Sequence, residues 1–224
     1  MSKSKLLIYL SAFFALLGVI VFCFQFFQNR NGVDLKTLDP NLYDQSWFTG
    51  HPCNSPCWQG IEPGISPREY VLATVRALPF IDTSNIVVHS QGVSFQCKES
   101  KNGNRHCIAM NFNNDILETL WLKPNYPITF EQAVEKLGIP DGFSIYPMDP
   151  GATACYLGLA WKEKQLVLEH IAPRPVWGDD LCSKIHNNGG KIPKGLLVES
   201  IVISLPGYAE RTMNDETWRG FADK

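Results

Sequence analysis

Hydrophobic and polar positions divide the chain into one long apolar run near the N-terminus and a larger part in which short apolar stretches alternate with polar turns. Residues 6–27 contain no charged side chain. A helix rises about 1.5 Å per residue, so a run of this length spans the roughly 30 Å hydrocarbon core of a bilayer. The pattern predicts a transmembrane helix over residues 6–27, preceded by a tail of residues 1–5.

The ends of this run bear on processing and orientation. A cleaved signal peptide has small residues at its cleavage site, but bulky aromatics surround Cys23, and Phe22 occupies the position where a lipoprotein signal has a small residue. We therefore expect an uncleaved signal anchor. Lys3 and Lys5 precede the helix and only Arg30 follows closely, so the positive-inside rule predicts a cytoplasmic N-terminus, with the remainder outside the cell membrane.

Beyond the anchor, eight segments have the alternating or β-branched composition typical of strands and are bounded by Gly, Pro and Asn. They are residues 85–89, 92–98, 105–112, 115–122, 142–146, 154–161, 165–171 and 196–205. Asn102-Gly103 predicts a hairpin turn between the second and third segments, because both residues tolerate a positive φ.

Two further segments predict helices that begin with a capping box, in which a hydroxyl and a Glu or Gln three residues later satisfy the first backbone N–H groups. Pro79 and Pro140 are expected to end these helices, since proline cannot continue the hydrogen-bond ladder. The boxes are Ser66 with Glu69 in residues 63–79, and Thr129 with Gln132 in residues 126–140.

Each predicted helix precedes four predicted strands, which indicates two related units. The expected fold class is α+β: a transmembrane helix followed by two units, each with one helix packed on an antiparallel β-meander. The units are residues 51–124 and 125–206, the second with an inserted loop at 172–195. Residues 28–50 lack periodicity and are interpreted as a linker, and residues 207–224 as a C-terminal tail.

The residues in and just after the two predicted caps support a family resemblance. They are Gly64, Ser66, Glu69 and Val71 in the first unit, and Thr129, Gln132, Val134, Leu137, Gly138 and Pro140 in the second. The pattern resembles the tandem units of the β-lactamase inhibitor protein and is similar to small outer-membrane assembly lipoproteins of the BamE and SmpA kind. The resemblance implies helices on one face of a curved sheet and a role in binding another protein, without catalysis in this unit. This chain departs from it in its membrane anchor and extra cysteines.

Six cysteines follow the predicted anchor: Cys53, Cys57, Cys97, Cys107, Cys155 and Cys182. In an exported domain such an even set predicts disulfides, whereas in the cytosol it would indicate catalytic or metal-binding thiols. The predicted hairpin turn brings Cys97 nearly opposite Cys107, which predicts a cross-strand disulfide. Cys53 and Cys57 could pair with each other, or with Cys155 and Cys182.

The stretch HPCNSPCW, residues 51–58, is the sharpest chemical candidate. His51, Cys53 and Cys57 could bind copper, or the two thiols could shuttle electrons as a dithiol. Two prolines bracket the loop and no βαβ pattern surrounds it, so we favour a structural disulfide, with Trp58 in the core. A redox or copper-handling protein is the first alternative function.

Other catalytic patterns are weak. The five histidines lack zinc-type spacing, and there is no G-x-S-x-G nucleophile motif. We therefore predict neither a metal site nor a cofactor, and we favour a non-catalytic protein. A hydrolase whose site is assembled from residues far apart in sequence is the second alternative.

Charge and aromatic residues bear on partners. Apart from Lys3 and Lys5, the chain has 18 Lys and Arg against 22 Asp and Glu, which argues against nucleic acid as a partner. Trp47, Trp177 and Trp218 fall in predicted loops, where they could contact a partner or pack in small clusters beneath the loops. The sequence as a whole predicts a membrane-anchored extracytoplasmic domain that binds a protein or a cell-envelope component.

Overall fold

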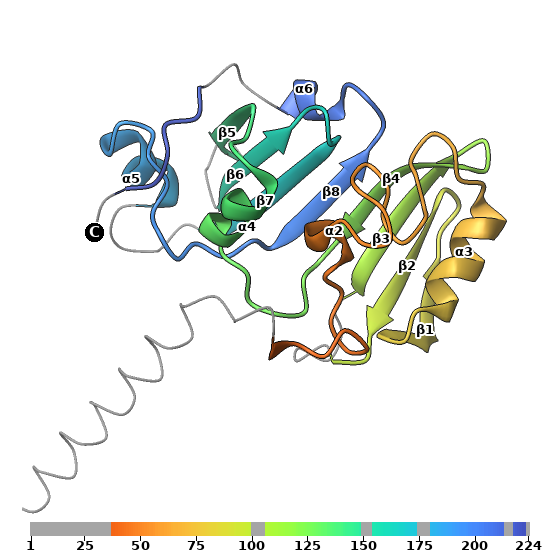
Figure 1. Ribbon diagram of the computed structural model, residues 1–224. Helices are drawn as coiled ribbons and strands as arrows, with labels where there is room; N and C mark the ends of the chain where they lie inside the picture. Colours follow the sequence, from red (N-terminus) through yellow and green to blue (C-terminus); the bar gives the residue numbers. More distant parts are fainter. Residues whose placement is uncertain (1–36, 100–105, 149–153, 174–179, 213–216, 223–224) are drawn as a thin grey trace, which may run out of the picture.

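The computed structural model describes residues 37–99, 106–148, 154–173, 180–212 and 217–222 (Figure 1). The predicted transmembrane segment 6–27, the predicted turn Asn102-Gly103 and Trp177 lie outside these ranges. Within the ranges themselves, none of the helices has the length and apolar character needed to cross a bilayer.

One antiparallel sheet of eight strands forms the body of the fold, which confirms the α+β class. Its strand order is β1-β2-β3-β4-β8-β7-β6-β5, so β4 and β8 meet at the centre. All eight predicted strands are present, although the first begins four residues earlier than expected. The strands are β1 (Ile81–Val88), β2 (Gly92–Cys97), β3 (His106–Asn113), β4 (Ile116–Leu122), β5 (Gly142–Pro147), β6 (Ala154–Trp161), β7 (Leu166–Pro173) and β8 (Ser200–Ser204).

The helices are short, and two of them cover the same face of the sheet. Val71 of α3 and Phe130 of α4 belong to one buried core with alternate residues of the strands, such as Ile201 and Ile203 of β8. We call the side facing this core the inner face. The described helices are α2 (Ser46–Thr49), α3 (Arg68–Ala77), α4 (Phe130–Leu137), α5 (Leu181–Asn187) and α6 (Tyr208–Thr212).

Helix α6 lies on the opposite, outer face. Its Ala209 packs with Ala160, Val167 and Val202 in a second, smaller cluster. Val202 lies between the core residues Ile201 and Ile203, and successive strand side chains point to opposite sides. The second cluster is therefore on the outer face.

Only one of the two predicted capping boxes forms. Thr129 Oγ1 accepts from the Gln132 N–H at 3.3 Å, and Gln132 Oε1 accepts from the Thr129 N–H at 3.0 Å. The Ser66 box is wrong: Pro67 is the N-cap of α3, and Ser66 Oγ instead accepts from the Glu62 N–H. The cause is that the Ser66 carbonyl accepts from Leu117 N beside β4, so the helix begins later than predicted.

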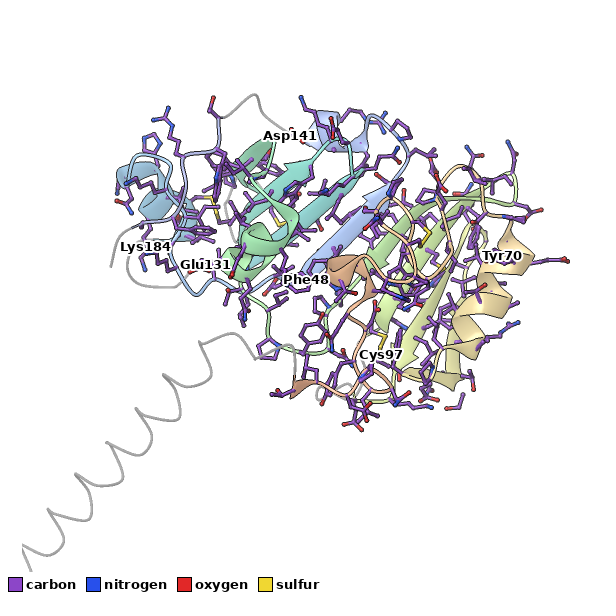
Figure 2. The ribbon with its side chains drawn as sticks, viewed as in Figure 1. Phe48, Tyr70, Cys97, Glu131, Asp141 and Lys184 are labelled. Carbon is purple, nitrogen blue, oxygen red and sulfur yellow. A yellow bond between two sulfur atoms is a disulfide. The ribbon has the colours of Figure 1, made fainter. Side chains whose placement is uncertain are left out.

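Two segments interpreted as a linker and a tail are part of the fold. In the interpreted linker, Trp47 and Phe48 of α2 are buried, and Figure 2 shows Phe48 over the middle of the sheet. In the interpreted tail, Phe221 bridges to Ile192. Both segments lack periodicity because each contributes single large side chains to the core and not one face of a long helix or strand. Residues 37–50 are therefore part of the folded domain and not a linker.

The six cysteines form three disulfides: Cys53–Cys57, Cys97–Cys107 and Cys155–Cys182. The predicted cross-strand pair is confirmed, but Cys107 is the extra residue of a β-bulge, since Phe95 pairs with Ile108 and Gln96 with His106. Cys155–Cys182 joins β6 to α5 and so attaches the inserted loop to the sheet.

Candidate binding surface on the outer sheet face

The outer face carries an exposed apolar row at the edge strand β5. Tyr146 of β5 lies opposite Tyr156 of β6, and Tyr156 lies opposite Ile171 of β7. Tyr146 is 38 % exposed, Ile171 39 % and the adjacent Met148 45 %. We call Tyr146, Met148, Tyr156 and Ile171 the tyrosine face. A group of exposed apolar side chains of this kind is typical of an interaction site.

Stacking orders the two rings of this row. The Tyr146 and Tyr156 ring centroids are 4.6 Å apart with an interplanar angle of 23°. Tyr156 is buried, whereas Tyr146 presents its remaining surface to solvent. The row is thus a supported aromatic platform rather than a pair of independently moving side chains.

A carboxylate beside the row anchors the buried ring. Glu169 Oε1 accepts from the Tyr156 hydroxyl at 2.9 Å, and Glu169 Oε2 accepts from Ser200 Oγ at 2.6 Å. Hydrogen bonds to an ionised acceptor are stronger than those between neutral groups. These bonds fix the Glu169 side chain and the Tyr156 ring together.

Gly158 leaves room for this arrangement. It lies directly opposite Glu169 in the β6–β7 register. A Cβ at this position would lie 2.7 Å from the Tyr156 hydroxyl oxygen and 3.0 Å from a ring carbon. The close approach of the Tyr156 ring to its own strand therefore requires glycine here.

The tyrosines around Glu169 are held in their neutral form. Burial, and then the negative charge of Glu169, raise the pKa of Tyr156 well above the ordinary value of 10.0. The same two causes raise the pKa of Tyr208 on α6 to about 12. The pKa of Tyr146 is raised too, again first by burial. At neutral pH these hydroxyls act as hydrogen-bond donors and not as phenolate nucleophiles.

A second carboxylate lies beside β7, just before the start of β8. Glu199 Oε2 accepts from the Ile171 backbone N–H at 3.1 Å, and its Oε1 is 3.8 Å from His170 Nδ1. The Glu199 side chain is 49 % exposed. In the part of the chain that the structure describes, no Lys or Arg lies within 4.0 Å of Glu169 or Glu199.

A hollow of about 300 Å³ lies on the inner side, beside α2. Its wall includes Asp44, whose oxygens accept from Trp58 Nε1 at 2.7 Å and from Ser46 Oγ at 2.7 Å. Ser46 N and Gln59 Nε2 donate as well. Burial raises the pKa of Asp44, against the effect of these bonds. With four donors around it, this carboxylate joins α2 to the loop before α3 and is structural.

The predicted chemical loop lies at the edge of this hollow. Cys53 and Cys57 are joined as a disulfide, and the Gly60 N–H lies 3.3 Å from Cys53 Sγ. His51 is exposed, whereas Trp58 is fully buried, as predicted. Across the described ranges, no three His, Cys, Asp or Glu side chains are grouped so that they could hold a metal ion.

The structure also locates the tryptophans predicted to contact a partner. Trp47 lies in α2 and is only 3 % exposed, so it packs in the core and does not present a surface to a partner. Trp218 is half-buried, with its ring centroid 6.4 Å from that of Phe143 and 5.2 Å from that of Phe221. Trp177 lies outside the described residues. Sequence reasoning missed the tyrosine face, although alternation along three strands places its residues on one side.

Comparison of the chain with protein-family models, with curated proteins and with solved structures gives no significant match. The roles assigned to residues therefore rest on the contacts, burial and charges of this chain. Of the two features described, only the tyrosine face combines exposed apolar area with an ordered polar support.

Proposed function

We propose that this protein is a single-pass, membrane-anchored extracytoplasmic domain that binds a protein or cell-envelope component through the tyrosine face and does not catalyse a reaction. The observation that carries the proposal is the exposed row of Tyr146, Met148 and Ile171 on a stacked and hydrogen-bonded base. Rigid aromatic side chains with low conformational entropy are the usual anchors of protein interfaces.

The polar groups beneath the row favour binding over catalysis. The Tyr156 and Ser200 hydroxyls both donate to Glu169, which therefore serves as their common acceptor. A general base needs a free acceptor within reach of the proton that it abstracts. Burial and Glu169 also keep the nearby phenols protonated. Glu169 and the hydroxyls that donate to it are therefore suited to fixing the conformation of the tyrosine face.

The cysteines and the N-terminal run support the location. Three disulfides are typical of proteins that mature in an oxidising compartment. The uncharged run of residues 6–27 supports an anchor in the cell membrane. Together they favour a cytoplasmic N-terminus and a domain on the other side of the membrane.

The strand order supports two related units. Helix α3 precedes β1–β4, α4 precedes β5–β8, and the last strand of each set meets the other at the centre of the sheet. We propose that the two sets descend from one repeated unit. The resemblance to tandem protein-binding units is consistent with the binding role, and the repeat leaves one continuous outer face for it.

Photo-crosslinking in the native membrane tests the binding role. A benzoylphenylalanine replaces Ile171 in the full chain, and a matched control replaces Ile139, which is 77 % exposed and lies between α4 and β5. We expect a discrete adduct from position 171 that is absent from position 139. No adduct at 171, or the same adducts from both positions, would overturn the proposal.

A further inference from the structure

Glu169, beside the tyrosine face, has no Lys or Arg within 4.0 Å in the described part of the chain. Glu169 is half-buried, and its donors are the neutral hydroxyls of Tyr156 and Ser200. Arg211 of α6 is close enough to act on Tyr208, but it is not within ion-pair distance of Glu169. A partly buried carboxylate gains most from an opposite charge when water is excluded around it. Binding of a partner would exclude that water.

The platform itself also favours a positive charge. One face of the Tyr146 ring stacks on Tyr156, while 38 % of the residue remains exposed. The face of an aromatic ring carries negative electrostatic potential and attracts an ammonium or guanidinium group within about 6 Å of its centroid. The Tyr146 ring and the Glu169 carboxylate therefore favour the same sign of charge.

Resting on the proposed function, we infer that the partner is a protein segment that places a Lys or Arg side chain across the tyrosine face, with its cation near Tyr146 and Glu169. Lys and Arg join an apolar stem to a charged end. The stem matches the exposed Met148 and Ile171, and the charged end matches Glu169. A purely apolar segment would exclude water around Glu169 without adding an opposite charge to its two neutral donors.

Selection from a displayed library of random twelve-residue peptides tests this inference on the full chain in lipid nanodiscs. Peptides that bind the wild type are then measured against four variants. Tyr146→Leu removes the ring but keeps apolar bulk, and Glu169→Gln removes the charge but keeps a hydrogen-bond acceptor. Tyr146→Phe keeps the ring, and Ile139→Ala is a remote control. Because cation–π and partly exposed charge contacts contribute about 1 kcal/mol, each disruptive change should weaken binding about fivefold.

We expect enriched peptides to contain Lys or Arg beside apolar residues and to bind Tyr146→Phe and Ile139→Ala like the wild type. Enriched peptides without cations, or no enriched peptide at all, would each overturn the inference. If the crosslink from position 171 persists in those cases, the binding role stands and only the partner's chemistry is wrong. If that crosslink is absent as well, both proposals fail.

Discussion

The Tyr156 hydroxyl donates to Glu169 Oε1 at 2.9 Å across β6 and β7, although the two residues are not directly opposed. Tyr156 lies opposite Ile171, and Glu169 lies opposite Gly158. The bond is therefore diagonal, and the Tyr156 ring reaches over a position without a side chain. Diagonal neighbours on one sheet face are within reach of aromatic side chains. The hydrogen bond that holds Tyr156 beneath the tyrosine face therefore depends on the absence of a side chain at Gly158.

Gly158→Ala should displace the Tyr156 ring, because the added Cβ would lie 2.7 Å from its hydroxyl oxygen. We expect a loss of about 1–3 kcal/mol in the free energy of unfolding, typical of an overpacked site. Denaturant unfolding of the full chain in detergent measures it. As a control, Gly158→Ala is also made in the Tyr156→Phe variant. Without the hydroxyl, the added Cβ should cost less free energy of unfolding. Equal losses in both backgrounds would contradict the role given to Gly158.

Tyr208 should make stability decline at alkaline pH. Burial, and then Glu169, raise its folded-state pKa from 10.0 to about 12. The folded state thus keeps a proton that the unfolded state releases, so this contribution is complete below pH 10 and is lost as pH rises toward 12. Unfolding measured across this range, with Tyr208→Phe as the comparison, should show a smaller decline in the variant. A variant as sensitive as the wild type would count against this contribution of Tyr208.

Asp44 should make the free energy of unfolding depend on pH in the acidic range. Burial raises its folded-state pKa above 3.8, so the folded state binds a proton more readily than the unfolded state. Its contribution to stability is therefore largest at low pH and falls as pH rises through the folded-state pKa. Asp44→Asn replaces an acceptor by an N–H₂ group that faces donors, and should lose about 1–3 kcal/mol at neutral pH. The difference from the wild type should grow on acidification, and a constant difference would contradict this account.

The three disulfides should differ in their contribution to stability according to loop length. Their sequence separations are 4 for Cys53–Cys57, 10 for Cys97–Cys107 and 27 for Cys155–Cys182. Loop-closure entropy predicts losses of about 2, 3 and 3.5 kcal/mol when each pair becomes serine. Unfolding of the three double variants would measure this order. If the Cys53–Cys57 variant lost most, that bridge would have a role beyond closing its short loop.

The strands were predictable because each alternates or carries β-branched residues over its whole length. The Thr129 box was predictable because its two partners, Thr129 and Gln132, lie only three residues apart and bond to each other across the first helical turn. The Ser66 box failed because a long-range bond to Leu117 decides where α3 begins. Long-range pairing of this kind is not visible in a local pattern.

The candidate surface was harder to predict for the same reason. Tyr146, Tyr156 and Ile171 lie on one row only in the observed register, and a shift of one residue would put them on opposite faces. The burial of Trp47 was not predictable, because a single large apolar residue in a segment without periodicity gives no indication of its burial. Tryptophan content alone therefore left its role open, whereas the strand register identifies the exposed tyrosine of the outer face.

Tyrosine footprinting gives the most direct test of binding through the tyrosine face. Intact cells and the purified full chain are labelled with iodine under identical conditions, and modification is quantified at Tyr146. Tyr70 is the internal control, since it is 48 % exposed and lies on α3, far from β5 in Figure 2. We predict that Tyr146 is protected in cells and reactive in the purified chain, while Tyr70 is equally reactive in both. Equal reactivity of Tyr146 in the two preparations would contradict binding at this face.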